Sequence, residues 1–175
     1  MRPDFQPGRR DIATALVLAV AGRRELEEGH PAAGQTGVNL DGILRHLHRL
    51  RPEDFPSTTR HDYRIVNSVG FALYKARDKR TMPRTAEVLD QENLSRLSEL
   101  LDAHITTIVT FSAPAELGVR SIGREPSLSF HHPSMSRLNS LYPRLGGTRP
   151  WRVEERYRLF AEELVASRPL RSADR

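Results

Sequence analysis

Short apolar runs alternate along the chain with segments of helical apolar spacing. Ala13–Ala21 (ATALVLAVA) is a continuous apolar run bounded by charge and by Gly22, which is typical of a buried strand. Tyr63–Val69 predicts a second strand, and Ile105–Phe111, rich in β-branched residues, predicts a third. Ser127–His131 predicts a short fourth strand. The pattern therefore predicts four strands, each followed by a polar segment.

Between these runs, apolar residues recur at the spacing of one helix face. The predicted helices are Gly37–Leu50, Glu92–His104, Ala113–Val119 and Trp151–Ser167, with Leu73–Pro83 a basic helix that fades into a loop and Met135–Pro150 a loop-rich segment with room for a short helix. Strands that alternate with helices predict an α/β fold, here a three-layer α/β/α sandwich around a short, mainly parallel four-stranded sheet. We expect a flexible arm over residues 1–11, one domain over 12–168 and a flexible tail over 169–175.

Length and composition narrow the class of protein. A chain of 175 residues is enough for one domain with its own core. There is no cysteine, which excludes disulfides, iron–sulfur clusters, thiolate zinc sites and cysteine nucleophiles. The longest apolar run is too short to span a bilayer, and the first residues do not resemble a signal peptide. We therefore expect a cytoplasmic monomer that has no membrane partner.

The positive charge is concentrated in the last third of the chain. Residues 1–119 hold 16 basic and 16 acidic residues, whereas residues 120–175 hold 11 arginines and 6 acids. Only two of the 27 basic residues are lysines, which a GC-rich genome would explain as well as function does. A GC-rich genome does not explain why the excess positive charge lies after residue 119. Arginine binds phosphate well because its planar guanidinium donates two hydrogen bonds at once. The C-terminal part is therefore predicted to face a polyanion.

Three polar segments fall at predicted strand ends. They are Gly22–Pro31, Asn67-Ser68 and His131–Asn139. Ligands of parallel sheets bind beyond the carboxyl ends of the strands, so these distant segments predict one site. Within the last segment, His132 precedes a proline, which would hold it rigidly enough to stabilise a developing anion, although a purely structural loop histidine is an open alternative. No third ligand stands near the two adjacent histidines at a recognisable spacing, so no metal site is predicted.

Four stretches between residues 14 and 140 carry motifs in a characteristic order. They are the strand end Val20-Ala21-Gly22, the glycine-punctuated loop Gly29–Gly37 with Leu40–Leu44 after it, the strand Tyr63–Val69, and Thr107–Ala115 with the later His132-Pro133-Ser134 and Met135–Asn139. In their joint order and spacing these stretches resemble the uracil-DNA glycosylase superfamily. The resemblance implies a DNA glycosylase that flips out a base, hydrolyses its N-glycosidic bond and leaves an abasic site, with DNA as partner and no cofactor.

The resemblance also implies roles for single residues. His132 would stabilise negative charge on the departing base, and Asn67 would hydrogen-bond the flipped base. Met135 or Leu138 would wedge into the duplex in its place. The residues implied in DNA binding are Ser134, Met135, Ser136, Arg137 and Leu138. Without the family resemblance, each of these residues has a structural interpretation. Asn67 would cap a helix, Met135 and Leu138 would belong to the core, and Arg137 would be a surface charge.

The chain departs from the family pattern at the water-positioning residue. That residue usually lies two positions after the strand-end glycine, where this chain has Arg24. Glu25 is therefore the candidate for a displaced catalytic acid, which would orient water and offset an oxocarbenium-like charge. The adjacent pair Arg23-Arg24 would bind phosphate or a polar substituent on the base, and a solvated charged turn is the alternative.

Two further departures concern the base pocket. Leu26 stands where the family often crowds the pyrimidine C5, and Ala32 stands where an aromatic residue would stack on the base. The predicted substrate-binding residues are Gly22, Arg23, Arg24, Leu26 and Ala32. Loss of a stacking partner weakens base binding by roughly 1–3 kcal/mol. The wider base pocket implied by these two positions therefore predicts that the substrate is not uracil but a modified pyrimidine, such as a hypermodified phage cytosine encountered in antiviral defence.

Two other functions stay open. A binding module would keep the fold but lack the acid, and would recognise unusual bases without excising them. An unrelated α/β enzyme that handles nucleotides would show no salt-sensitive DNA binding, whereas a protein that contacts many phosphates loses affinity steeply as salt rises.

Overall fold

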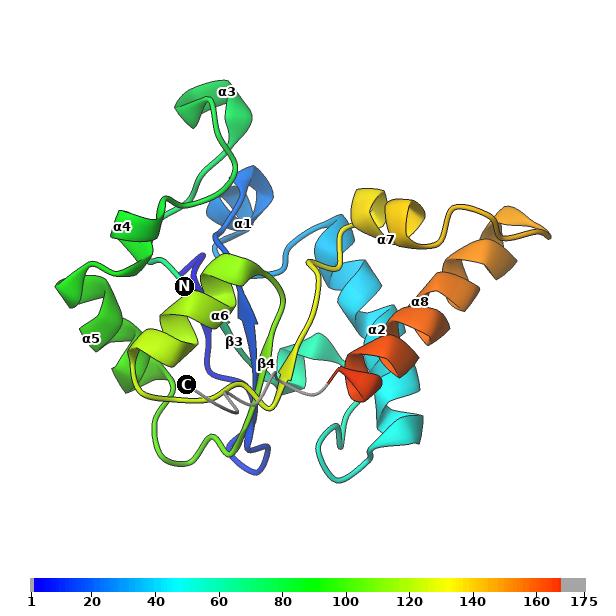
Figure 1. The fold of residues 1–175 in the computed structure, drawn as a ribbon, viewed down its shortest axis with the longest axis horizontal. Helices are drawn as coiled ribbons and strands as arrows, with labels where there is room; N and C mark the ends of the chain where they lie inside the picture. Colours follow the sequence, from blue (N-terminus) through cyan, green and yellow to red (C-terminus); the bar gives the residue numbers. More distant parts are fainter. Residues whose placement is uncertain (1, 168–175) are drawn as a thin grey trace, which may run out of the picture.

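The computed structural model describes residues 2–167, and the predicted tail at 169–175 lies outside them. Within this part the chain is an α/β fold around a five-stranded, mostly parallel sheet (Figure 1). The strands are β1 (Phe5–Gln6), β2 (Thr14–Leu18), β3 (Arg64–Asn67), β4 (Thr107–Thr110) and β5 (Leu128–Ser129). Their order is β1-β3-β2-β4-β5, with β1 antiparallel to β3 and the other neighbours parallel.

The four strands predicted from apolar runs are present, but each is shorter than its run. In β2 all five residues are buried, which is why the run lacks the alternation of a half-exposed strand. The sheet nevertheless has five strands and not four, because the predicted flexible arm contributes β1. Phe5 pairs with Val66 and Gln6 with Ile65. A two-residue edge strand has no periodicity to detect, so the sequence could not show it.

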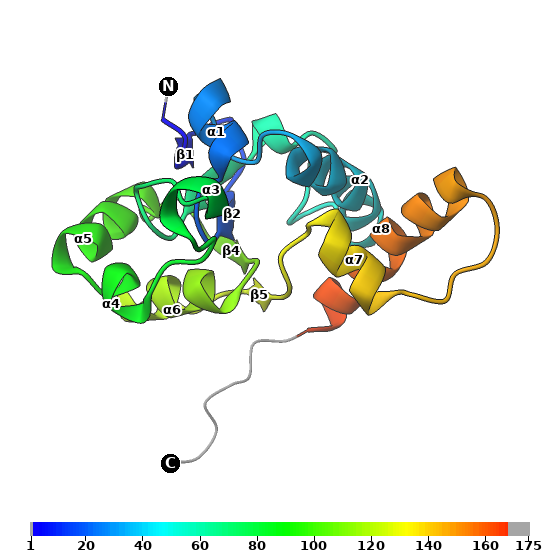
Figure 2. The ribbon, with the colours of Figure 1, turned by 90° about the horizontal axis from the view of Figure 1, so that it is seen from above.

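Helices cover both faces of the sheet (Figure 2). The helical elements are α1 (Arg23–Glu28), α2 (Gln35–Leu50), the 3₁₀ turn η1 (Arg60–Asp62), α3 (Lys75–Asp78), α4 (Thr85–Val88), α5 (Gln91–Leu100), α6 (Ala113–Ser121), α7 (Met135–Leu141) and α8 (Arg149–Ala166). Side chains of β2 alternate between the faces: Leu16 packs into the core under α2 and α8, and Val17 into the core under α5 and α6. None of the helices in residues 2–167 has an apolar stretch that could cross a bilayer.

The segment Gly22–Pro31, expected to be a polar loop, contains helix α1. It has no buried residue, so its sequence shows no apolar face that would predict a helix. Its ends are defined by glycines: Gly22 is the N-cap, and Gly29 closes the helix in the left-handed region at φ 74°.

A buried ion pair holds the N-terminal segment against the sheet. The Arg96 guanidinium on α5 contacts the Asp4 carboxylate at 2.9 Å and also donates to the Asn67 carbonyl at 2.9 Å. Asp4 is buried, and Arg2 contacts the same carboxylate oxygen at 3.1 Å. Burial lowers the pKa of Arg96, and Asp4 opposes that shift. The arm is therefore tied to the sheet by charge pairing with a helix about ninety residues away.

We expect Asp4→Asn to lower the free energy of unfolding by about 1–3 kcal/mol, because Arg96 would keep its charge without a counter-charge. Urea denaturation followed by circular dichroism measures the change. Asp11→Asn is the matched control, since its ion pair with Arg9 is fully exposed and is screened by solvent, so its loss should change stability little. Equal stability of the two variants would contradict the prediction.

Candidate active site

The carboxyl ends of the parallel strands place the predicted polar segments at one edge of the sheet. Figure 1 shows α1, the start of α6 and the start of α7 on this same side. β2 and β4 are neighbours, yet the chain leaves β2 toward the α2 face and leaves β4 toward the α6 face. Such a change of direction opens a crevice between two strand ends, where α/β proteins commonly bind ligands.

Glu25 folds back over the end of β2. Its Oε2 accepts a hydrogen bond from the backbone N–H of Gly22 at 3.0 Å. A Cβ at position 22 would lie 2.9 Å from that oxygen, so glycine there gives the carboxylate room. Burial raises the pKa of Glu25, and the nearby Glu28 adds to the shift while His30 opposes it. Oε1 makes no hydrogen bond to residues 2–167, which leaves one carboxylate oxygen able to orient a water molecule.

Arg23 and Arg24 lie on the exposed side of α1. The Arg23 guanidinium donates to Glu27 at 2.7 Å one turn along the helix. The stem of Arg24 packs over Gly34, and no carboxylate in the described chain pairs with its guanidinium. Leu26 is 44% exposed on the same helix. The first turn of α1 therefore presents one unpaired arginine and one apolar side chain to solvent.

His132 is half-buried just before α7. Burial lowers its pKa, so the imidazole is neutral at neutral pH, and no residue in the range 2–167 hydrogen-bonds its ring. The loop is anchored one residue later, where the Pro133 carbonyl accepts a hydrogen bond from the buried amide of Asn39 at 2.8 Å. Asn39 in turn accepts from the Tyr157 hydroxyl at 2.9 Å. A neutral imidazole held in this way can donate its N–H to an oxygen that gains negative charge.

The neighbouring His131 makes different contacts. Arg137 donates to its Nδ1 at 3.0 Å, and the Phe130 ring lies 5.0 Å from the imidazole. Burial, with a further contribution from the charge of Arg137, lowers the pKa of His131. Arg137 is exposed, and its guanidinium remains close enough to solvent to reach a phosphate.

The residues predicted to contact DNA lie at the start of helix α7 and differ in how far they are buried. The Ser134 hydroxyl accepts from the Arg137 backbone N–H at 3.3 Å and caps the helix. Ser136 is exposed and Met135 is half-buried against the core. Leu138 is completely buried in that core. The prediction that either Met135 or Leu138 forms the wedge is therefore corrected: only Met135 can reach a duplex, because Leu138 would have to leave the core.

Two predicted pocket residues do not face solvent. Asn67 is 1% exposed; its Nδ2 donates to the Pro3 carbonyl at 3.2 Å, and its Oδ1 is buried without a partner in residues 2–167. The N-terminal segment, expected to be flexible, thus covers the residue expected to read the base. Ala32 is completely buried in the core beside α2 and has φ 52°. The interpretation of Ala32 as an enlarged pocket wall is therefore corrected, because it borders no open space.

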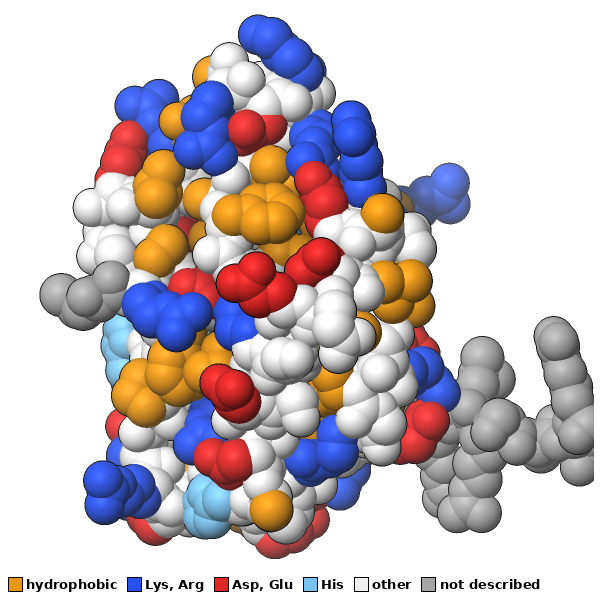
Figure 3. Space-filling model, turned by 90° about the vertical axis from the view of Figure 1, so that its left-hand side faces the viewer, with side chains coloured by type: hydrophobic (Ala, Val, Ile, Leu, Met, Phe, Trp, Pro, Cys, Tyr) orange, Lys and Arg blue, Asp and Glu red, His pale blue; other side chains and the backbone are white. Residues whose placement is uncertain are grey.

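Basic side chains of α3 border this edge, although they were assigned no function from the sequence. Figures 1 and 2 place α3 beside α1, and Figure 3 shows Lys and Arg side chains gathered at the top of the molecule, where α3 lies. Lys75, Arg77 and Lys79 belong to this turn, and Arg77 also lies 4.6 Å from the Tyr74 ring. In the sequence, the basic composition of Leu73–Pro83 could have indicated these residues.

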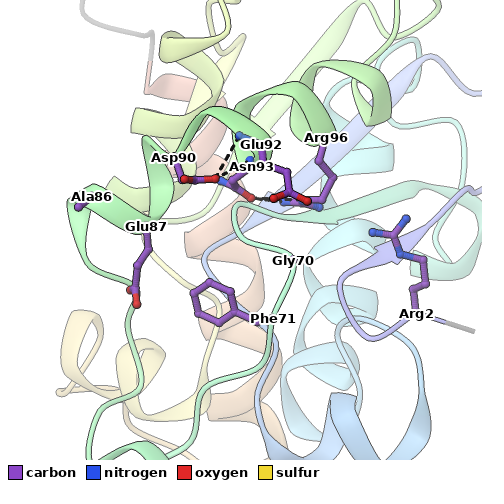
Figure 4. A pocket seen from close by; sticks show the side chains of 9 residues that line it. All are labelled: Arg2, Gly70, Phe71, Ala86, Glu87, Asp90, Glu92, Asn93 and Arg96. Carbon is purple, nitrogen blue, oxygen red and sulfur yellow. Dashed lines mark hydrogen bonds between the residues drawn. The ribbon is translucent and has the colours of Figure 1, made fainter.

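A cavity of about 680 Å³ lies after the end of β3, between Phe71 and the start of α5 (Figure 4). Three of its charged residues have partners within the protein: Arg2 and Arg96 pair with Asp4, and Glu87 contacts Arg80 at 2.6 Å. Asn93 donates to the backbone carbonyls of Ser68 and Val88. Most polar groups of this cavity therefore stabilise the fold. Within residues 2–167, no cluster of three His, Asp or Glu side chains is arranged to hold a metal ion.

No protein-family model matches the chain, and no curated protein is significantly similar to it. The resemblance to the uracil-DNA glycosylase superfamily therefore stays a prediction, and only the chemistry of the site can indicate a function.

Proposed function

We propose that the protein is a monofunctional DNA glycosylase that hydrolyses the N-glycosidic bond of a flipped pyrimidine and leaves an abasic site. The observation that carries the proposal is the placement of Glu25 and His132 beyond the carboxyl ends of two strands of the same parallel sheet, β2 and β5, which flank β4. One is a half-buried carboxylate with a free oxygen, and the other is a neutral, rigidly anchored imidazole. Basic residues of α1 and α3 lie on the Glu25 side of this edge.

In this mechanism Glu25 orients a water molecule toward C1′ and offsets the positive charge of the oxocarbenium-like sugar. His132 donates a hydrogen bond to the base oxygen as the bonding electrons pass to the base. The water oxygen bonds to C1′, one of its protons passes to Glu25, and that proton then reaches the departing base. Met135 would occupy the space that the flipped base leaves.

The proposed substrate is a modified pyrimidine, such as a hypermodified phage cytosine. Support comes from α1, where Arg24 has no carboxylate partner in the described chain and Leu26 is exposed beside it. A guanidinium without a partner can hydrogen-bond a hydroxyl or sugar substituent, which unmodified uracil lacks. Excision of such a base would make the protein an antiviral defence factor.

The test is incubation with DNAs that contain uracil, ordinary bases, hydroxymethylcytosine or glucosylated cytosine, followed by counting of abasic sites with an aldehyde-reactive probe. Abasic sites in modified-cytosine DNA alone support the proposal in full. Efficient excision of uracil with none of any 5-substituted pyrimidine would overturn the substrate assignment and keep the glycosylase.

A second candidate is a binding module of the same fold. Two contacts favour it: the Glu25 carboxylate is used as a helix cap, and the Asn67 amide is bonded to Pro3 and covered. If wild-type protein binds modified DNA in a salt-sensitive manner but produces no abasic sites on any of these DNAs, the binding module is correct and the glycosylase is not.

The pH dependence of excision follows from the two shifted groups. The mechanism needs Glu25 ionised and His132 neutral. Burial raises the pKa of Glu25 above 4.5 and lowers the pKa of His132 below 6.5. We expect a constant rate at neutral pH and a rate that falls on acidification as the two groups take up protons, measured under single-turnover conditions. A rate that rises on acidification would contradict the assigned protonation states.

A further inference from the structure

A second cavity, of about 530 Å³, lies between α2, α7 and the first half of α8. Three arginines of α8, Arg149, Arg152 and Arg156, line it at positions i, i+3 and i+7, which place them on one face of the helix. Gln35 of α2 and Met135 of α7 form part of the opposite wall. No acidic residue lines this cavity within the described chain.

Arg156 is the unusual member of this group. It is only 9% exposed, its Nε is buried without a hydrogen-bond partner, and its Nη1 makes one long hydrogen bond of 3.4 Å to the Arg152 carbonyl. No carboxylate of residues 2–167 lies within 4.0 Å of any of the three guanidinium groups. A buried charge without a counter-charge is costly, and two further cations beside it increase the cost.

Two other arginines near this helix, by contrast, are paired. Arg45 contacts Glu154 at 2.9 Å, and Arg158 contacts both Glu155 and Glu162. The cavity in Figure 4 follows the same rule, since its arginines face Asp4. The cavity between α2 and α8 is the exception, so its missing counter-charge points to an anion that the chain itself does not supply.

The cavity is physically linked to the loop that carries His132. Gln35 donates to the buried Asn39 at 2.9 Å, and Asn39 donates to the Pro133 carbonyl at 2.8 Å. Met135, which lines the cavity, is three residues after His132. An anion bound here would therefore be connected to the His132 loop through Asn39 and Met135.

We propose that this cavity binds a phosphate group of the DNA backbone next to the flipped nucleotide, with Arg149, Arg152 and Arg156 as its cationic partners. The planar guanidinium fork matches two phosphate oxygens, and three guanidinium groups can satisfy all the free oxygens of a phosphodiester. The proposal rests on the proposed DNA function but not on catalysis, because binding of the backbone does not require excision.

The test compares two variants by fluorescence anisotropy with a labelled duplex over a range of salt concentrations. Each lost phosphate contact reduces the slope of log K against log salt by about 0.9. We expect Arg149→Gln/Arg152→Gln to reduce the slope by about 2 and to lower affinity at least tenfold in low salt. Arg158→Gln is the control on the same helix, since its guanidinium is already paired with Glu155 and Glu162, and it should change the slope by less than about 0.5.

A second variant separates binding from structure. Arg156→Met removes the buried charge while it keeps most of the side-chain volume. If the residue binds phosphate, the variant loses DNA affinity but is at least as heat-stable as the wild type, because an unpaired charge has been removed. If Arg156 only supports the fold, the variant is less stable and binds DNA normally, which overturns the proposal.

The source of the phosphate is tested with inorganic phosphate and pyrophosphate in thermal shift assays. Protection by these ions that depends on Arg156, together with unchanged DNA affinity of the arginine variants, would assign the cavity to a free phosphate compound and overturn the backbone proposal. Loss of DNA affinity in the variants without any abasic sites from wild type would support this cavity and contradict the glycosylase.

Discussion

Glu25→Gln is expected to lower the single-turnover rate of base excision by about 10²–10⁴-fold, while affinity for the substrate DNA changes little. The amide keeps the volume of the carboxylate, and its oxygen can still accept the hydrogen bond from Gly22. It cannot carry the negative charge that orients water and stabilises the sugar cation. The variant therefore separates the charge of Glu25 from its role as the cap of α1.

The matched control is Glu27→Gln, two residues along the same helix. Glu27 is exposed and pairs only with Arg23, so the same loss of charge should change the excision rate less than about threefold. Circular dichroism and thermal unfolding establish that both variants are folded. A Glu25→Gln protein that is folded and fully active would remove Glu25 from the mechanism.

Gly42→Ala is expected to lower the free energy of unfolding by about 3 kcal/mol, the largest stability change predicted for this chain. Gly42 faces the ring of Tyr157 where α2 crosses α8, and an added Cβ would lie less than 3.0 Å from three ring carbons. The ring cannot easily move away, since it is buried and its hydroxyl is bonded to Asn39. The usual gain in helix propensity from Gly to Ala, about 1 kcal/mol, is too small to compensate.

Gly146→Ala is the control for this prediction. A Cβ at position 146 meets no atom within 4 Å, so we expect a change of no more than about 0.5 kcal/mol. Urea denaturation of both variants measures the difference. Because Asn39 also holds the Pro133 carbonyl, displacement of α8 in Gly42→Ala should loosen the His132 loop as well. Unchanged stability would show that α2 and α8 can separate without cost.

The parallel strands could be predicted because each is buried on both faces. Ala15 and Leu16, for example, face opposite cores and are both completely buried, so the chain there must be apolar throughout. Helix α2 could also be predicted from the sequence, since only one of its faces is buried. Helix α1 could not be predicted, because none of its residues is buried and its ends depend on glycine conformations.

The strand pattern predicted which polar segments share one edge of the sheet, but not the surroundings of each residue. The carboxyl ends of parallel strands share that edge, so Glu25 and His132 could both be assigned to it from strand positions alone. The roles of Leu138, Ala32 and Asn67 could not, because a leucine, alanine or asparagine at a strand or helix end is compatible with either core or surface. The fold places the first two in the core and covers the third with Pro3.

By itself, the sequence determined the alternation of strands and helices, the polar edge of the sheet and the excess of arginine after residue 119, because each is a local property of composition or spacing. The tertiary structure alone decided which charges have partners. Arg96 meets Asp4 from across the chain, whereas Arg156 is buried with no carboxylate near it in residues 2–167. Ion pairs join residues that are distant in sequence, so only the folded chain shows which arginine remains to bind an external anion.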